Sequence, residues 1–287
     1  MIYISSSCVK ATTIEDAVKT LVHEGFTNIE LSGGTRYDEK ALDKLIRLKK
    51  EYNINFLLHN YFPTPANSFV LNLASLDSEI SKYSLEHVKK AIDWSVELNA
   101  KKYAFHAGFL INIPVHQIGK KIEKAQLFDL QSAVNKFEKN LDAIDEYNNN
   151  RIQLYIENNV LSQTNYESFD LVDPFFFTSS KNARLFRKPN GVNFLLDAAH
   201  LKVSCNSLSL NFEDEFKKLY NQTDYFHISD NDGKSDSNQG LTEGSELYDV
   251  LKKNWKPGKV VTIEVYSGMN DIKNTHRVLE KLNNRNE

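Results

Sequence analysis

Val-Asn-Phe-Leu-Leu-Asp-Ala-Ala-His, residues 192–200, is a short apolar run that ends in Asp197 and leads to His200. The run directly follows a Pro-Asn-Gly turn sequence, so it predicts a buried strand with Asp197 at its carboxyl end. A carboxylate in that position is costly unless something compensates its charge. A metal ion would do so, and His200 offers a second metal-binding side chain. A purely structural explanation is that Asp197 caps the next helix and that His200 lies in its first turn.

The same arrangement of an apolar strand ending in a polar side chain recurs along the chain. Strands are predicted at 2–5, 28–31, 55–59, 102–106, 153–157, 192–197, 224–228 and 260–264. A first helix ending at Gly25 is followed by predicted helices at 41–52, 83–98, 128–147, 179–187, 212–220, 245–253 and 270–282. This alternation in 287 residues predicts a closed (β/α)8 TIM barrel, with residues 1–287 forming a single domain. An open doubly wound sheet is the alternative, but no Gly-rich phosphate-binding motif follows the first strand.

Composition and charge restrict the classes of protein that the chain can belong to. The formal net charge of −3 gives no overall basic field for holding a polyanion, so a dedicated nucleic-acid binder is disfavoured. Cys8 and Cys205 form no CxxC pair and are interpreted as free thiols in a reducing compartment. Met1 leads straight into the first strand, and no apolar run approaches membrane-spanning length. We therefore expect a cytoplasmic protein without membrane partners.

Metal-capable side chains mark the carboxyl ends of the predicted strands, which converge on one mouth in a (β/α)8 barrel. These side chains are His59, His106, Glu157, Asp197, His227 and Glu264, with His200 just beyond. Singly, each has an ordinary explanation as a buried hydrogen-bonded histidine, an ion-pair partner or a helix cap. Together they would be many buried polar groups that need partners, and a shared divalent ion would satisfy most of them. Glu30 is interpreted as structural, because the strand 28–31 is short and leaves its register open.

The types of ligand indicate the metal. Three carboxylates and one imidazole form a mostly hard oxygen site at Glu157, Asp197, His227 and Glu264. Such a site suits Mn²⁺, Mg²⁺ or Co²⁺ better than an ion that prefers sulfur. His59 and His106 add two imidazoles, which would favour additional Zn²⁺.

At this level the chain resembles the xylose isomerase-like barrels. This superfamily includes sugar and sugar-phosphate isomerases and epimerases, hydroxypyruvate isomerase and the endonuclease IV-type AP endonucleases. The resemblance covers nearly the whole chain. It is carried by His59, Phe105-His106-Ala107-Gly108, Glu157-Asn158, Asp197-Ala198-Ala199-His200, His227-Ile228-Ser229-Asp230, Asp236-Ser237-Asn238, Glu243-Gly244 and Glu264.

The resemblance implies two different kinds of metal centre. In the ketose 3-epimerases, a glutamate, aspartate, histidine, glutamate quartet surrounds one ion, and the matching positions are Glu157, Asp197, His227 and Glu264. The AP endonucleases add the equivalents of His59, His106 and His200, together with an Asp-x-His sequence after strand seven, and hold three zinc ions. This chain has Asp236-Ser237-Asn238 at that place, so the last histidine is missing and the third zinc site is in doubt.

The resulting expectation is a divalent-metal-dependent isomerase or epimerase that acts on a small sugar, sugar phosphate or hydroxy-ketone through a metal-stabilised enediolate. By the resemblance, Glu157 and Glu264 would lie on opposite sides of the ion and transfer the proton. His200 would donate a hydrogen bond to a substrate oxygen. Tyr61 and Phe62 would stack on the sugar, with packing against nearby prolines as an equally weighted explanation.

Two other classes of function stay open. One is an endonuclease IV-like zinc phosphodiesterase that acts on abasic DNA, and the other is a barrel that binds a sugar without converting it. Lys120, Lys121 and Lys124 are interpreted as a solvated helix face rather than as a phosphate site. The expected partner is a small sugar-like molecule, and a homo-oligomer is compatible with the sequence.

Overall fold

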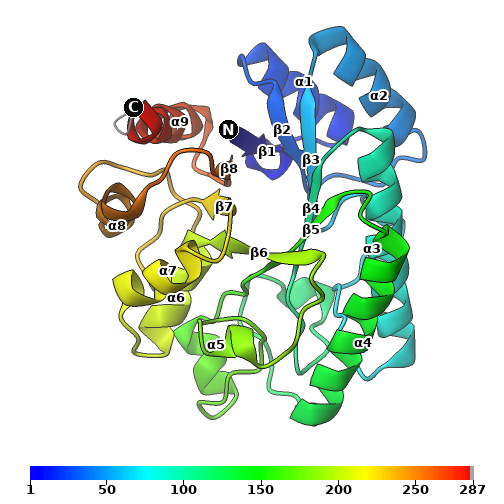
Figure 1. Cartoon of the computed structure of the whole chain (residues 1–287), viewed down its shortest axis with the longest axis vertical. Helices are drawn as coiled ribbons and strands as arrows, with labels where there is room; N and C mark the ends of the chain where they lie inside the picture. Colours follow the sequence, from blue (N-terminus) through cyan, green and yellow to red (C-terminus); the bar gives the residue numbers. More distant parts are fainter. Residues whose placement is uncertain (285–287) are drawn as a thin grey trace.

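A closed barrel of eight parallel strands forms the centre of the protein (Figure 1). The computed structural model describes residues 1–284. The strands are β1 (Ile2–Ser5), β2 (Asn28–Leu31), β3 (Asn55–His59), β4 (Lys102–His106), β5 (Gln153–Glu157), β6 (Val192–Asp197), β7 (Tyr225–Ile228) and β8 (Val260–Ile263). They pair in sequence order, and β1 closes the barrel on β8 with Ile4 beside Ile263. The predicted TIM barrel is confirmed, and the open doubly wound sheet is wrong.

Amphipathic helices surround the barrel (Figure 1). They are α1 (Ile14–His23), α2 (Ala41–Tyr52), α3 (Ser78–Glu97), α4 (Leu130–Asn148), α5 (Gln163–Ser168), α6 (Ala198–Ser207), α7 (Phe212–Tyr220), α8 (Glu246–Asn254) and α9 (Met269–Asn284). Helix α3 begins earlier than predicted, because the Asp77 side chain accepts hydrogen bonds from the backbone N–H groups of Glu79 and Ile80 and so caps it. Within residues 1–284, none of the helices combines the length and the apolar character needed to cross a bilayer.

Several predicted elements differ in the structure. The helix predicted at 179–187 is wrong in extent, because the structure has only one 3-10 turn there, η3 (Asn182–Arg184). Phe186, just after this turn, packs against Phe137 and Phe176. Helix α5 is not predicted from the sequence, whereas α6 is the helix that the structural explanation of Asp197 and His200 places directly after the strand 192–197. The lysines of 120–124 lie in an irregular loop, not on a helix face, and Lys124 pairs with Asp170. Strand β8 ends one residue before Glu264.

The interior of the barrel is layered with a period of two residues. Its middle is apolar and is filled by Tyr3, Leu57, Ala104, Tyr155, Leu195 and Tyr225. Toward the amino ends of the strands, Lys102 donates to Gln153 and Asp224, so an ion pair closes that end of the barrel. Successive inward side chains are two residues apart in a strand, so the next layer toward the carboxyl ends consists of strand-end residues. The metal-capable side chains therefore lie directly above an apolar floor.

Candidate metal centre

Glu157, Asp197 and His227 are buried side by side at the carboxyl ends of β5, β6 and β7. Their exposed fractions are 0%, 1% and 0%. Asp197 and His227 are paired positions in the β6–β7 register, which places the two side chains next to each other. One ligand atom from each of the three residues lies within 4.8 Å of the others. Glu264, just after β8, completes the predicted quartet, with its Oε2 3.4 Å from His227 Nδ1.

The facing atoms of this group have no hydrogen-bond partner among the described residues. They are Glu157 Oε1, Asp197 Oδ2 and His227 Nδ1. Glu157 Oε1 lies 3.4 Å from His227 Nδ1. Buried polar atoms are normally satisfied, and leaving several unpaired at one point is costly. Oxygen and imidazole ligands that converge in this way fit a hard or borderline divalent cation.

The structural and the metal interpretations of Asp197 both apply, because its two oxygens have different surroundings. Oδ1 accepts a hydrogen bond of 2.7 Å from the backbone N–H of His200 and caps α6. Oδ2 is the unpartnered oxygen that faces Glu157 and His227. Asn158 fixes the backbone here, because its side chain accepts from the Asp197 N–H and donates to the Asp197 carbonyl. The cap therefore aims the free oxygen into the site.

Burial and neighbouring charges shift the pKa values of these side chains. Burial raises the pKa of Asp197 to about 7, and the neighbouring carboxylate of Glu157 also raises it, while His200 opposes the shift. Burial works against ionisation of Glu264, but the nearby His227 prevails and lowers the pKa of that carboxyl to about 2. Burial lowers the pKa of His106 to about 4, so its imidazole is neutral at pH 7 and has a lone pair for a ligand.

Four further predicted residues surround the quartet at the mouth. His59 Nε2 lies 2.6 Å from Glu157 Oε2, and His106 Nδ1 lies 3.4 Å from the same oxygen without a hydrogen bond. His200, in the first turn of α6, places its Nε2 3.3 Å from Asp236 Oδ2. His106 and Asp236 have the most exposed side chains of the group, at 24% and 25%.

Asn238 occupies the place where an AP endonuclease would have a zinc-binding histidine. Its side-chain oxygen accepts a hydrogen bond of 3.1 Å from the Ser229 hydroxyl, and the residue is 8% exposed. The amide is thus used to hold the loop after β7. It supplies no replacement for the missing ligand.

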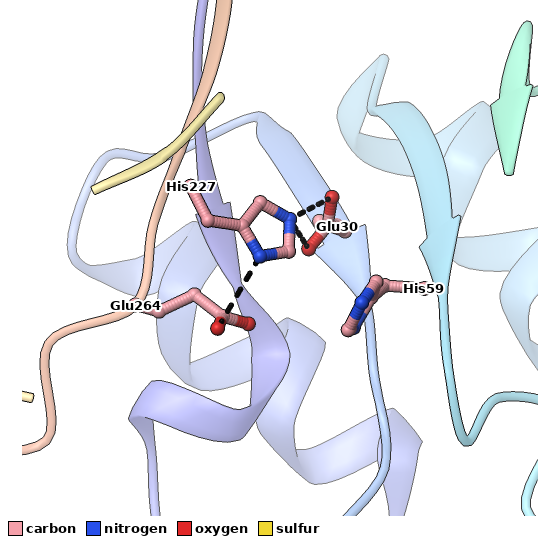
Figure 2. Close-up of side chains that lie close together, drawn as sticks. All are labelled: Glu30, His59, His227 and Glu264. Atoms are coloured by element: carbon pink, nitrogen blue, oxygen red, sulfur yellow. Dashed lines mark hydrogen bonds and ion pairs between the residues drawn. The ribbon is translucent and has the colours of Figure 1, made fainter. Parts of the chain in front are cut away.

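Glu30 is the site residue that the sequence reasoning missed. It is fully buried, and its carboxylate lies 3.1 Å from His227 Nε2, on the other side of the ring from Glu264 (Figure 2). Glu30 therefore contacts a candidate metal ligand directly, which its interpretation as an ordinary structural residue does not include. The signal was present in the sequence, because Ile29 and Leu31 on either side leave Glu30 as the inward residue of its strand.

The aromatic pair after β3 packs into the protein. Phe62 is 1% exposed and its ring lies 5.6 Å from that of Trp94 in α3, which favours the packing explanation over the predicted stacking on a sugar. The Tyr61 ring packs near Phe69 and His87, and its hydroxyl accepts a hydrogen bond from the Leu71 N–H. These contacts favour the packing explanation for Tyr61, against α3 rather than against the adjacent prolines.

Comparison with known proteins places the chain in a family. Residues 18–284 match the family described as xylose isomerase-like TIM barrel. The chain belongs to this family. The predicted resemblance is thereby confirmed over nearly the whole barrel, including every strand end that contributes to the candidate metal centre, and only β1 lies before the matched residues.

Solved structures with the same fold belong to both branches that the sequence suggested. A D-tagatose 3-epimerase-like protein is 18% identical, with a TM-score of 0.73, and the alignment covers 98% of this chain and 96% of that one. The TTHB071 protein of Thermus thermophilus, soaked with ZnCl2, is 17% identical, with a TM-score of 0.64 and coverage of 99% and 98%. Endonuclease IV of the same organism is 12% identical, with a TM-score of 0.59 and coverage of 98% and 99%. At these identities the likeness shows the fold.

Proposed function

We propose that this protein is a divalent-metal-dependent isomerase or epimerase of a small sugar, sugar phosphate or hydroxy-ketone. The observation that supports this most directly is the convergence of unpartnered buried atoms from Glu157, Asp197 and His227, with a carboxylate of Glu264 beside them. Membership of a family whose fold is shared with sugar 3-epimerases agrees with it. We infer the substrate class from the resemblance to this family and to the sugar epimerases that share its fold.

The four residues Glu157, Asp197, His227 and Glu264 would hold the ion. A bound divalent ion would supply Lewis-acid polarisation of a substrate carbonyl. Glu157 and Glu264 then offer two carboxylates at one point, so that one removes the proton next to the carbonyl and the other returns a proton. Both carboxylates are buried, at 0% and 7% exposure, so their interactions with charge that develops on the substrate are little screened by water. His200 Nδ1 is held by the Asn158 carbonyl, and its Nε2 lies 3.3 Å from Asp236 Oδ2, so a hydrogen bond from Nε2 to a substrate oxygen would replace the contact with Asp236.

A panel of ketoses and aldoses, incubated with the Mn²⁺- or Co²⁺-loaded protein in deuterated water, tests this proposal. Proton NMR is expected to show a new sugar isomer or epimer, with deuterium at the carbon that loses its proton. A product that keeps the substrate's own hydrogen would contradict proton transfer and favour a metal-assisted hydride shift. No conversion of any sugar by fully loaded protein would contradict the isomerase proposal and favour a sugar-binding barrel.

A second candidate function is a zinc phosphodiesterase acting on abasic DNA. The observation in its favour is the gathering of His59, His106 and Asp236 beside the quartet, with His106 Nδ1 and Asp236 Oδ1 unpartnered. Two features weigh against it: Asn238 is committed to Ser229 where a zinc ligand is needed, and the net charge of −3 is unfavourable for binding a polyanion.

We expect no strong incision of a duplex that contains an abasic site, even with Zn²⁺ in excess. The measurement is gel analysis of a labelled duplex at catalytic protein concentrations, with a known endonuclease as the positive control. His59→Ala and His106→Ala are the matched variants. Efficient cleavage by the wild type that disappears in both variants would show that the endonuclease function is right and the isomerase proposal wrong.

A further inference from the structure

The buried carboxylate of Glu30 makes two contacts that the proposed proton transfer does not require. Its Oε2 lies 3.2 Å from His227 Nε2 and accepts a hydrogen bond of 3.0 Å from the Thr262 hydroxyl in β8. Both Glu30 and Thr262 are 0% exposed. Because an ionised carboxylate only accepts hydrogen bonds, the contact with His227 requires a hydrogen on Nε2 of the ring.

In the neutral ring that binds a metal ion, a hydrogen on Nε2 leaves Nδ1 as the nitrogen with a lone pair. Nδ1 is the atom that faces Glu157 Oε1 and Glu264 Oε2, each at 3.4 Å. Figure 2 shows the ring of His227 between the two glutamates Glu30 and Glu264. Metal-binding histidines commonly donate their second N–H to a carboxylate, which sets the ring orientation and strengthens the ring as a ligand.

Glu30 is itself close enough to other side chains to be considered as a ligand. Together with His59, His227 and Glu264, it forms a group in which one ligand atom from each residue lies within 4.8 Å of the others. However, Glu30 contacts Nε2 of His227, whereas Glu264 contacts Nδ1. One ion cannot bind both nitrogens of a single imidazole ring, so an ion at Nδ1 has the ring between itself and Glu30.

We propose that Glu30 is a positioning residue, which holds the His227 ring so that Nδ1 points at the metal site, without being a ligand. The inference rests on the proposed function, since it needs a divalent ion bound by the quartet. Thr262 has a supporting part, because its hydroxyl fixes the Glu30 oxygen that meets Nε2.

Glu30→Gln tests this role, because it keeps the size of the side chain and removes the charge. The amide can also rotate and present its NH₂ group to Nε2, which favours a hydrogen on Nδ1 and blocks the ligand atom. In calorimetric titration of metal-free protein with Zn²⁺, we expect the dissociation constant to rise about 10–100-fold. In Zn²⁺-loaded wild type labelled with ¹⁵N-histidine, NMR is expected to show His227 protonated on Nε2 and metal-bound through Nδ1. In the variant that Nε2–H signal should shift strongly or disappear.

Variants at Thr262 and Tyr225, which lie next to Glu30 or to its partner, provide a second test and a control. Thr262→Val removes one of the two hydrogen bonds to Glu30, so we expect a several-fold loss of Zn²⁺ affinity. If Glu30→Gln does not fold, the Zn²⁺ affinity of Thr262→Val tests the positioning role instead. Tyr225→Phe removes a hydroxyl 3.4 Å from Thr262 and leaves Glu30 in place, so it should bind Zn²⁺ like the wild type. Unchanged affinity in Glu30→Gln, or an equal loss in Tyr225→Phe, would overturn the positioning role.

The two proposals fail in distinguishable ways. If the wild type binds Zn²⁺ and Glu30→Gln binds it equally well, only the role of Glu30 is overturned. If the wild type binds no divalent ion, the metal-dependent function and the role of Glu30 are both overturned. If Zn²⁺ binding weakens in Glu30→Gln but no sugar is converted by the wild type, the positioning role is supported and the isomerase function alone fails.

Discussion

Glu157→Gln and Glu264→Gln are each expected to lower turnover of the sugar substrate by at least roughly 10²–10⁴-fold, the usual contribution of a general acid or base. The amide keeps an oxygen that can face the ion, so metal content should fall only partially. What the variant lacks is the ability to accept a proton. The measurement is turnover with metal restored to saturation, together with metal content by elemental analysis.

The two variants should also differ from each other. If one carboxylate removes the proton and the other returns it, one variant is expected to exchange substrate hydrogen with deuterated solvent without completing the reaction. Glu215→Gln is a matched control, because Glu215 is also a buried glutamate, at 5% exposure, but it lies on α7, outside the barrel, and accepts from the Ser180 N–H. That variant should turn over normally. Near-wild-type rates for both site variants with metal restored would show that Glu157 and Glu264 are ligands only.

Divalent metal is expected to stabilise the folded protein strongly, because only the folded barrel assembles the ligands. At a free ion concentration 100-fold above the dissociation constant, the gain in unfolding free energy is about 2.7 kcal/mol. For a chain of this size, that corresponds to a rise in Tm of roughly 4–5 °C. Differential scanning calorimetry of chelator-treated protein, before and after addition of Mn²⁺, Co²⁺ or Zn²⁺, measures it.

Asp197→Asn is the informative variant for this effect. Asparagine also caps helices well, so α6 should keep its cap, while the charged ligand oxygen that faces Glu157 is replaced by a neutral amide. Burial already raises the pKa of Asp197 to about 7, so removing the charge should not destabilise the metal-free protein. We expect the metal-free Tm to be maintained and the increase caused by metal to shrink. A wild type that contains no metal when purified and gains nothing from added ions would refute the metal centre.

The barrel and the gathering of the four candidate ligands at one end of it could be predicted from the sequence because both depend on local chemistry. Short apolar strands alternate with amphipathic helices, which predicts parallel strands, and eight such units without a Gly-rich phosphate-binding motif favour a closed barrel over an open sheet. The polar residue at the end of each apolar run also marks the carboxyl end of its strand, and in a closed barrel these ends meet. Glu157, Asp197 and His227 could therefore be grouped although they lie far apart in the chain.

Only the tertiary structure decided where the less regular side chains point. The apolar residues on either side of Glu30 place it on the opposite face of its short strand, but only the pairing of β2 with β1 and β3 in the closed barrel shows that this face points inward toward His227. The loop after β3 has no periodicity to reveal its orientation, so Phe62 could be placed against Trp94 only by long-range packing. The same holds for Asn238, whose partner Ser229 is set by a loop. The strands and the polar residues at their ends can thus be recognised from the local sequence. The direction of a loop side chain, in contrast, depends on contacts with distant parts of the chain.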